Sequence, residues 1–167
     1  MRSLWLLLVA VAVCGTAAAE VAVHPCRLLG KAEVRAALGA PVTRVTPGLT
    51  EDGQGGNCEF AVEGGGVTVT VFDAQMLEGK SVSAFLDDTD SQVPFRAVQG
   101  LGEVFLASGN RDFVEGNPET SLSAASLFAR EGPRLLSIVI MVAGKGPSDE
   151  AVLKLARRAL LRLTPEH

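Results

Sequence analysis

The strongest constraint on the fold is a pair of cysteines, Cys26 and Cys58, in a chain that begins like an exported protein. Residues 1–19 combine an early arginine, the apolar run 4–13 and three alanines ending at Ala19, which is the pattern of a cleavable export signal. Cleavage after Ala19 leaves two cysteines in an oxidising compartment, where an even number favours a disulfide. A Cys26–Cys58 bond closes a loop of about 33 residues and is expected to contribute roughly 3 to 4 kcal/mol.

The start of the chain leaves two alternatives open. A permanent membrane anchor needs about 20 apolar residues, and the run 4–13 is half that length. Cys14 is a candidate lipid acceptor, although Val13 stands where such sites require a small residue. We expect a periplasmic or secreted protein cleaved near Ala19, with membrane association through Cys14 as the weaker alternative.

Residues 20–167 are expected to form a single domain, because 148 residues are close to the commonest domain size. They carry 14 Lys and Arg against 19 Asp and Glu, a net charge of −5. Phosphate binding needs a concentrated basic face, so this balance argues against nucleic acid as a partner.

Alternating apolar residues predict antiparallel hairpins. The clearest joins 58–63 to 67–72 through Gly64–Gly66, and another joins 122–130 to 135–142. The last of these strands lacks alternation, so we expect it near the middle of the sheet with both faces covered. Shorter strands are predicted in the following ranges: 42–49 at an edge because of Pro47, 95–98 and 103–108.

Three helices accompany these strands. Helical spacing predicts a short helix over 31–38 after Gly30 and an internal helix over 75–88. A longer terminal helix starts at the cap Ser148. Its expected buried stripe is Val152, Ala156, Ala159, Leu160 and Leu163. The predicted class is α+β: mainly an antiparallel sheet of hairpins, packed by a short N-terminal helix, an internal helix and a long C-terminal helix.

Catalytic and cofactor signatures are mostly missing from the sequence. A serine or cysteine nucleophile usually needs a histidine base, and His24 and the final His167 are both poorly placed. The glycines of 100–102 and 144–146 suit turns better than nucleotide loops. We therefore expect no enzymatic activity, no cofactor and no bound metal.

One acidic cluster leaves an alternative open. Asp87, Asp88 and Asp90 have the carboxylates that Ca²⁺ prefers, or that acid–base catalysis uses. The residues that follow do not match a calcium loop, and a solvated helix end is the favoured interpretation.

The only coherent charged surface predicted is basic, and it lies on the terminal helix: Lys154, Arg157, Arg158 and Arg162. Three of these share a stripe at spacings of four residues. This surface suits an acidic partner or anionic lipid, although a solvated face that offsets the helix dipole is the simpler interpretation.

Short segments around the cysteines carry a resemblance to known sequences. They are Pro25-Cys26-Arg27-Leu28-Leu29, Ala32-Glu33-Val34, Ala36-Ala37-Leu38-Gly39, Pro41-Val42, Gly56-Asn57-Cys58-Glu59-Phe60 and Gly100-Leu101-Gly102-Glu103. This pattern resembles a broad group of uncharacterised bacterial secreted proteins and lipoproteins. The resemblance implies a cysteine pair across helix and strand, an envelope location and a PsbP-like sandwich of sheet and helices. It implies no activity.

The leading hypothesis is a non-enzymatic binding or accessory domain of the cell envelope, with an unknown protein or small ligand as its partner. A membrane-associated, lipoprotein-like protein is the second hypothesis. An acidic-site or calcium-dependent enzyme is the third.

Overall fold

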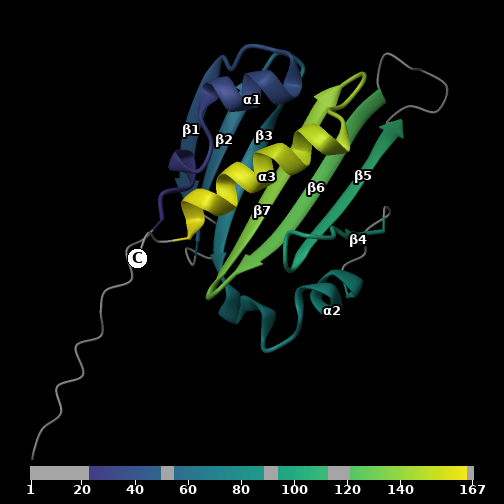
Figure 1. The fold of residues 1–167 in the computed structure, drawn as a ribbon. Helices are drawn as coiled ribbons and strands as arrows, with labels where there is room; N and C mark the ends of the chain where they lie inside the picture. Colours follow the sequence, from purple (N-terminus) through teal and green to yellow (C-terminus); the bar gives the residue numbers. More distant parts are fainter. Residues whose placement is uncertain (1–22, 50–54, 89–93, 113–120, 165–167) are drawn as a thin grey trace, which may run out of the picture.

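The computed structural model describes residues 23–49, 55–88, 94–112 and 121–164. They contain the strands β1 Arg44–Leu49, β2 Gly56–Val62, β3 Gly65–Asp73, β4 Arg96–Ala97, β5 Val104–Asp112, β6 Ser121–Glu131 and β7 Arg134–Ala143. The helical segments are η1 Pro25–Arg27, α1 Lys31–Leu38, η2 Ala74–Leu77, α2 Val82–Asp87 and α3 Asp149–Leu163. The strands form one seven-stranded antiparallel sheet in the order β1-β2-β3-β7-β6-β5-β4, which confirms the predicted α+β class (Figure 1).

The hairpin from β2 to β3 turns more tightly than its three glycines predict. Val62 pairs with Gly65, so only Glu63 and Gly64 lie in the turn, and Gly64 takes a φ of 75°. Gly65 belongs to β3 instead, where an added Cβ would lie 2.0 Å from the carbonyl oxygen of Met141. This close approach to β7 requires glycine, which explains the second residue of the run.

Strand β7 is the fourth of the seven strands, as its unbroken apolar run predicts. One of its faces is fully covered, because Leu136, Ile138 and Ile140 are each 0% exposed. On the opposite face Leu135 is buried but Met141 is 54% exposed. The second face of the sheet is therefore covered at one end only.

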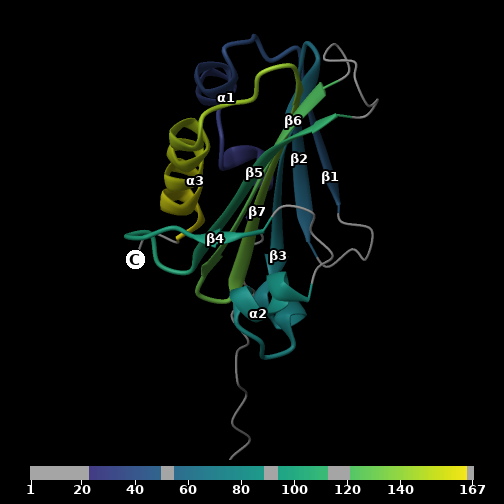
Figure 2. The same ribbon diagram turned by 90° about the vertical axis from the view of Figure 1, so that its right-hand side faces the viewer.

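Segments η1, α1 and α3 lie together on the first face of the sheet and form what we call the helical layer (Figures 1 and 2). Helix α3 packs there with a buried stripe of Val152, Leu155, Ala156, Ala159 and Leu163. Leu160, predicted in this stripe, is half-buried, and Leu155 takes the more central place.

The internal helix is shorter than predicted. In place of one helix over 75–88, the structure has the short turn η2 and then α2, separated by Glu78 and Gly79 at φ values of 51° and 80°. Two successive left-handed residues cannot continue a right-handed helix. A new start follows, where Ser81 accepts a hydrogen bond from the Ala84 N–H at 3.2 Å.

Segments η2 and α2 cover the second face of the sheet at its Leu135 end. Leu77, Val82 and Leu86 are buried against Leu135, with several phenylalanines around them: Phe72, Phe85, Phe95, Phe105 and Phe128. The rings of Phe95 and Phe128 meet edge to face with centroids 5.6 Å apart. This satellite cluster fixes α2 to the sheet.

Candidate functional site

The predicted Cys26–Cys58 disulfide is confirmed, with the sulfur atoms 2.02 Å apart. It joins η1 to the middle of β2, where Cys58 is completely buried. The bond thus holds the start of the helical layer against the sheet. Its role in this position is structural.

The predicted basic surface on α3 divides into two parts. Lys154, Arg157 and Arg158 are exposed and form no hydrogen bond or ion pair with any of the residues that the structure describes. Arg162 instead turns toward α1 and is held there. Three of the four predicted cations are therefore open to a partner.

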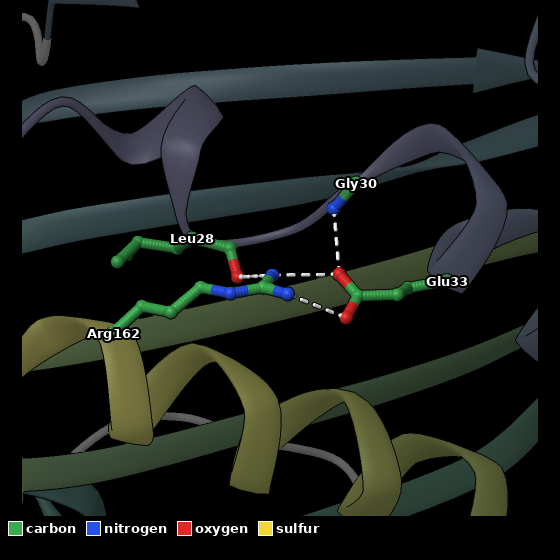
Figure 3. Close-up of polar contacts among 4 residues, drawn as sticks. All are labelled: Leu28, Gly30, Glu33 and Arg162. Carbon is green, nitrogen blue, oxygen red and sulfur yellow. Dashed lines mark hydrogen bonds and ion pairs between the residues drawn. The ribbon is translucent and has the colours of Figure 1, made fainter.

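Arg162 of α3 binds Leu28, which follows η1, and Glu33 of α1 (Figure 3). Its guanidinium donates two hydrogen bonds of 2.7 Å to the Glu33 carboxylate and one of 2.8 Å to the Leu28 carbonyl. Glu33 in turn accepts a hydrogen bond from the Gly30 N–H at 2.7 Å. This bidentate pair, which we call the Glu33–Arg162 clamp, ties α3 to the start of α1.

The Glu33–Arg162 clamp changes the acidity of both partners. The hydrogen bonds from Arg162 hold the pKa of the Glu33 carboxyl below its ordinary value, against the opposing effect of partial burial. The Gly30 N–H and the charge of nearby Arg158 lower this pKa further. Glu33 is consequently a fixed carboxylate and is unsuited to act as a proton donor near neutral pH.

A groove of about 400 Å³ runs between α1 and α3, beside the clamp. Its lining residues come from both helices: Ala32, Glu33, Ala36, Ala37, Ser148, Glu150, Ala151, Lys154, Leu155 and Arg158. Most of this surface is apolar, because four of the ten side chains are single methyl groups and Leu155 forms part of the floor. The volume falls within the range of small-molecule sites, roughly 300 to 1,000 Å³.

The α1/α3 groove contains two of the open cations. Lys154 and Arg158 lie one helical turn apart on α3, so both side chains reach the same stretch of the groove. The two carboxylates of the groove differ in their pairing. Glu33 is paired with Arg162, whereas Glu150, at the first turn of α3, forms no ion pair with the described residues. The arrangement suits a ligand with an apolar body and one anionic group.

The acidic cluster Asp87, Asp88 and Asp90 lies only partly within the described residues. Asp88 pairs with Lys80 at 2.6 Å, and Asp90 lies outside the described residues. Within residues 23–49, 55–88, 94–112 and 121–164, no three His, Cys, Asp or Glu side chains come together in a way that would hold a metal ion.

A second hollow, of about 300 Å³, lies at the start of α3 beside the 144–146 glycines. Asp149 stands in its wall, where it accepts a hydrogen bond of 2.8 Å from the Ser108 hydroxyl and pairs with Arg96. Because this carboxylate occupies the helix N-terminus, the hollow does not favour an anion. Asp149 instead links α3 to β4 and β5.

The remaining candidate residues of the sequence are His24, Cys14 and His167. His24 is exposed next to η1, while Cys14 and His167 lie outside the described residues. No helix in the described ranges is long and apolar enough to cross a bilayer.

The fold and the groove define the class as an antiparallel α+β domain with one helical layer and a disulfide. Comparisons with protein-family models, with curated proteins and with solved structures find no match. The resemblance to secreted proteins and lipoproteins, and with it the PsbP-like sandwich, stays a prediction.

The groove was not predicted from the sequence, because its two walls lie more than 100 residues apart. Two signals were present. Ala32 and Ala36 leave one side of α1 with small side chains, and Glu33 stands three residues after the cap Gly30. Neither signal indicates that α3 lies alongside.

Proposed function

We propose that the chain is an exported, non-enzymatic binding domain, and that the α1/α3 groove is its site for a ligand with an apolar body and an anionic group. The observation that carries this proposal is the pairing of an apolar groove with the open cations Lys154 and Arg158. Ligand sites commonly combine apolar walls with a few polar groups that orient the ligand.

The export part of the proposal rests on residues 1–19 and on the disulfide. A disulfide persists in oxidising compartments and is rare in the cytoplasm of most organisms. Intact-mass measurement of the protein recovered from its host tests this part. We expect a chain that begins at Glu20 without an acyl group; an acylated chain beginning at Cys14 would establish the lipoprotein alternative.

The non-enzymatic part is supported by the pairing of the hydroxyl and carboxylate side chains beside the two hollows. Ser108 donates to a carboxylate that also pairs with Arg96, and the Glu33 carboxylate is held by Arg162. Turnover of a substrate in a broad hydrolase panel by the purified protein, lost on Asp149→Asn or Glu33→Gln, would overturn this part.

Dodecanoate is a suitable probe of the α1/α3 groove, because it joins an apolar chain to one carboxylate. We expect it to raise the melting temperature of the protein, since a ligand that binds only the folded state stabilises that state. Uncharged dodecanol is expected to bind at least about ten-fold more weakly, because a hydrogen bond to a charged group contributes about 1.5–3 kcal/mol.

Matched variants locate the binding. Ala36→Phe fills the groove and Lys154→Gln removes one cation, so each is expected to reduce the dodecanoate shift. Arg44→Gln removes one cation from β1 and is expected to leave the shift unchanged. Equal shifts in all three variants would show that the groove is not the site.

A further inference from the structure

The positive charge of the chain is concentrated in the helical layer. The segments η1, α1 and α3 contain seven Lys and Arg against three Asp and Glu, a net charge of +4. The rest of residues 20–167 contains seven basic against sixteen acidic residues, a net charge of −9. Figure 2 shows these three segments on one side of the sheet, so a chain that is acidic as a whole has its basic segments on that side.

Six of the seven basic side chains in the helical layer are free of ion pairs within the described part of the chain: Arg27, Lys31, Arg35, Lys154, Arg157 and Arg158. All six are exposed. Of the acidic residues, Glu33 and Asp149 are already paired with arginines, which leaves Glu150 as the one unpaired carboxylate of these segments. Because two of the three carboxylates are already paired, the helical layer presents more unpaired positive charge than its net charge of +4 indicates.

One large apolar side chain stands among these cations. Leu161 is 73% exposed on α3, four residues after Arg157 and three after Arg158, so the three side chains share one stripe. Helices that lie on anionic membranes likewise combine basic residues with apolar side chains that enter the interface.

We propose that the helical layer docks onto an anionic lipid bilayer, with Arg27, Lys31, Arg35 and Arg157 over the headgroups and Leu161 entering the interface. The cations are spread over three segments instead of converging on one point, which fits a laterally continuous surface of negative charge. The acidic remainder of the chain is repelled by the same surface, so the charge distribution fixes the orientation.

Vesicle sedimentation with the purified protein tests this proposal at about 0.05 M salt, where charges are weakly screened. We expect binding to vesicles of phosphatidylglycerol and phosphatidylcholine, no binding to phosphatidylcholine alone, and release as the salt rises. The variant Lys31→Gln, Arg35→Gln, Arg157→Gln leaves the α1/α3 groove residues intact. It is expected to bind on the order of 100-fold more weakly, at about five-fold for each cation.

A charge-matched control carries Arg44→Gln, Lys80→Gln and Arg130→Gln, which lie on β1, between η2 and α2, and on β6. It has the same net charge, and its affinity for the vesicles is expected to stay within about two-fold of the parent, in contrast to the loss of about five-fold per headgroup cation. Equal loss in both variants would mean that total charge matters and not the helical layer, which overturns the proposal.

The variant Leu161→Gln distinguishes binding to a bilayer from binding to an acidic protein. Insertion into lipid makes this variant weaker on vesicles but not on soluble polyglutamate. Binding to polyglutamate without binding to the anionic vesicles would assign the helical layer to an acidic protein partner and overturn the lipid assignment. Absence of vesicle binding at low salt would overturn it as well.

Discussion

Arg162 shows how tertiary packing selects one residue from a uniform stripe. From the sequence, Lys154, Arg158 and Arg162 share one face of a helix and look equivalent. Of these three, Arg162 forms the hydrogen bonds with Glu33, which is 129 residues away in the chain. Helical spacing predicts which side chains share a face, but the approach of α1 decides which of them is bound.

Glu33→Gln tests the energetic contribution of the Glu33–Arg162 clamp. The substitution keeps the shape of the side chain but removes its charge, and at pH 7 we expect the free energy of unfolding to fall by about 1–2 kcal/mol. The estimate is modest because the side chain of Arg162 is 42% exposed. Urea denaturation measures the difference, and Glu59→Gln on the exposed side of β2 serves as the neutral control.

The same clamp predicts a pH dependence with a definite sign. The pKa of Glu33 is lowered in the folded protein, so its contribution is complete above the ordinary carboxyl value of 4.5 and is lost as pH falls through the lower folded value. The parent and Glu33→Gln proteins should therefore converge in stability in acid. A difference that stays constant from pH 7 to pH 3 would contradict the clamp.

Among the elements, the disulfide makes the largest single contribution that we predict. Reduction frees η1 from β2 and restores the entropy of a loop of about 33 residues to the unfolded chain, worth roughly 3–4 kcal/mol. We expect dithiothreitol to lower the melting temperature by on the order of 10 °C. Non-reducing mass spectrometry should find no alkylatable thiol in the exported protein; two free thiols there would refute the prediction.

The break between η2 and α2 depends on local backbone geometry. Gly79 has a φ of 80° and nothing within 4 Å of an added Cβ, so Gly79→Ala adds backbone strain without a clash. We expect a loss of about 1 kcal/mol. Glu78→Gly, at a φ of 51°, should not destabilise in the same way. Thermal unfolding of the two variants compares them, and equal losses would show that the left-handed turn is not what limits this segment.

The elements differ in how far the sequence determines them. Strands such as β7 and helices such as α1 follow from local periodicity and glycine stops, and both occur where they are predicted. The 75–88 segment is different, because Leu77, Val82 and Leu86 keep helical spacing and face the same cluster although the chain turns between them. Periodicity records which residues are buried together, and it does not distinguish one helix from two short ones.

The whole molecule is asymmetric across its sheet. The helical layer covers the first face, whereas η2 and α2 cover only one end of the second face (Figures 1 and 2). Charge follows the same division, with the excess of cations on the helical side. The α1/α3 groove and the exposed Leu161 belong to that side too, so both proposals concern the helical layer.

Two residues of β7 test the partial coverage of the second face. Leu135 and Met141 point to the same side of one strand. Leu135 is 0% exposed and packs against Leu77 and Val82, whereas Met141 is 54% exposed. Leu135→Ala should lower the free energy of unfolding by about 2–4 kcal/mol, because it opens a cavity under α2. Met141→Ala should change it by less than about 0.5 kcal/mol, as expected for an exposed position. Chemical denaturation gives both values, and a cost at Met141 as large as that at Leu135 would mean that a partner or a further segment covers this end of the sheet.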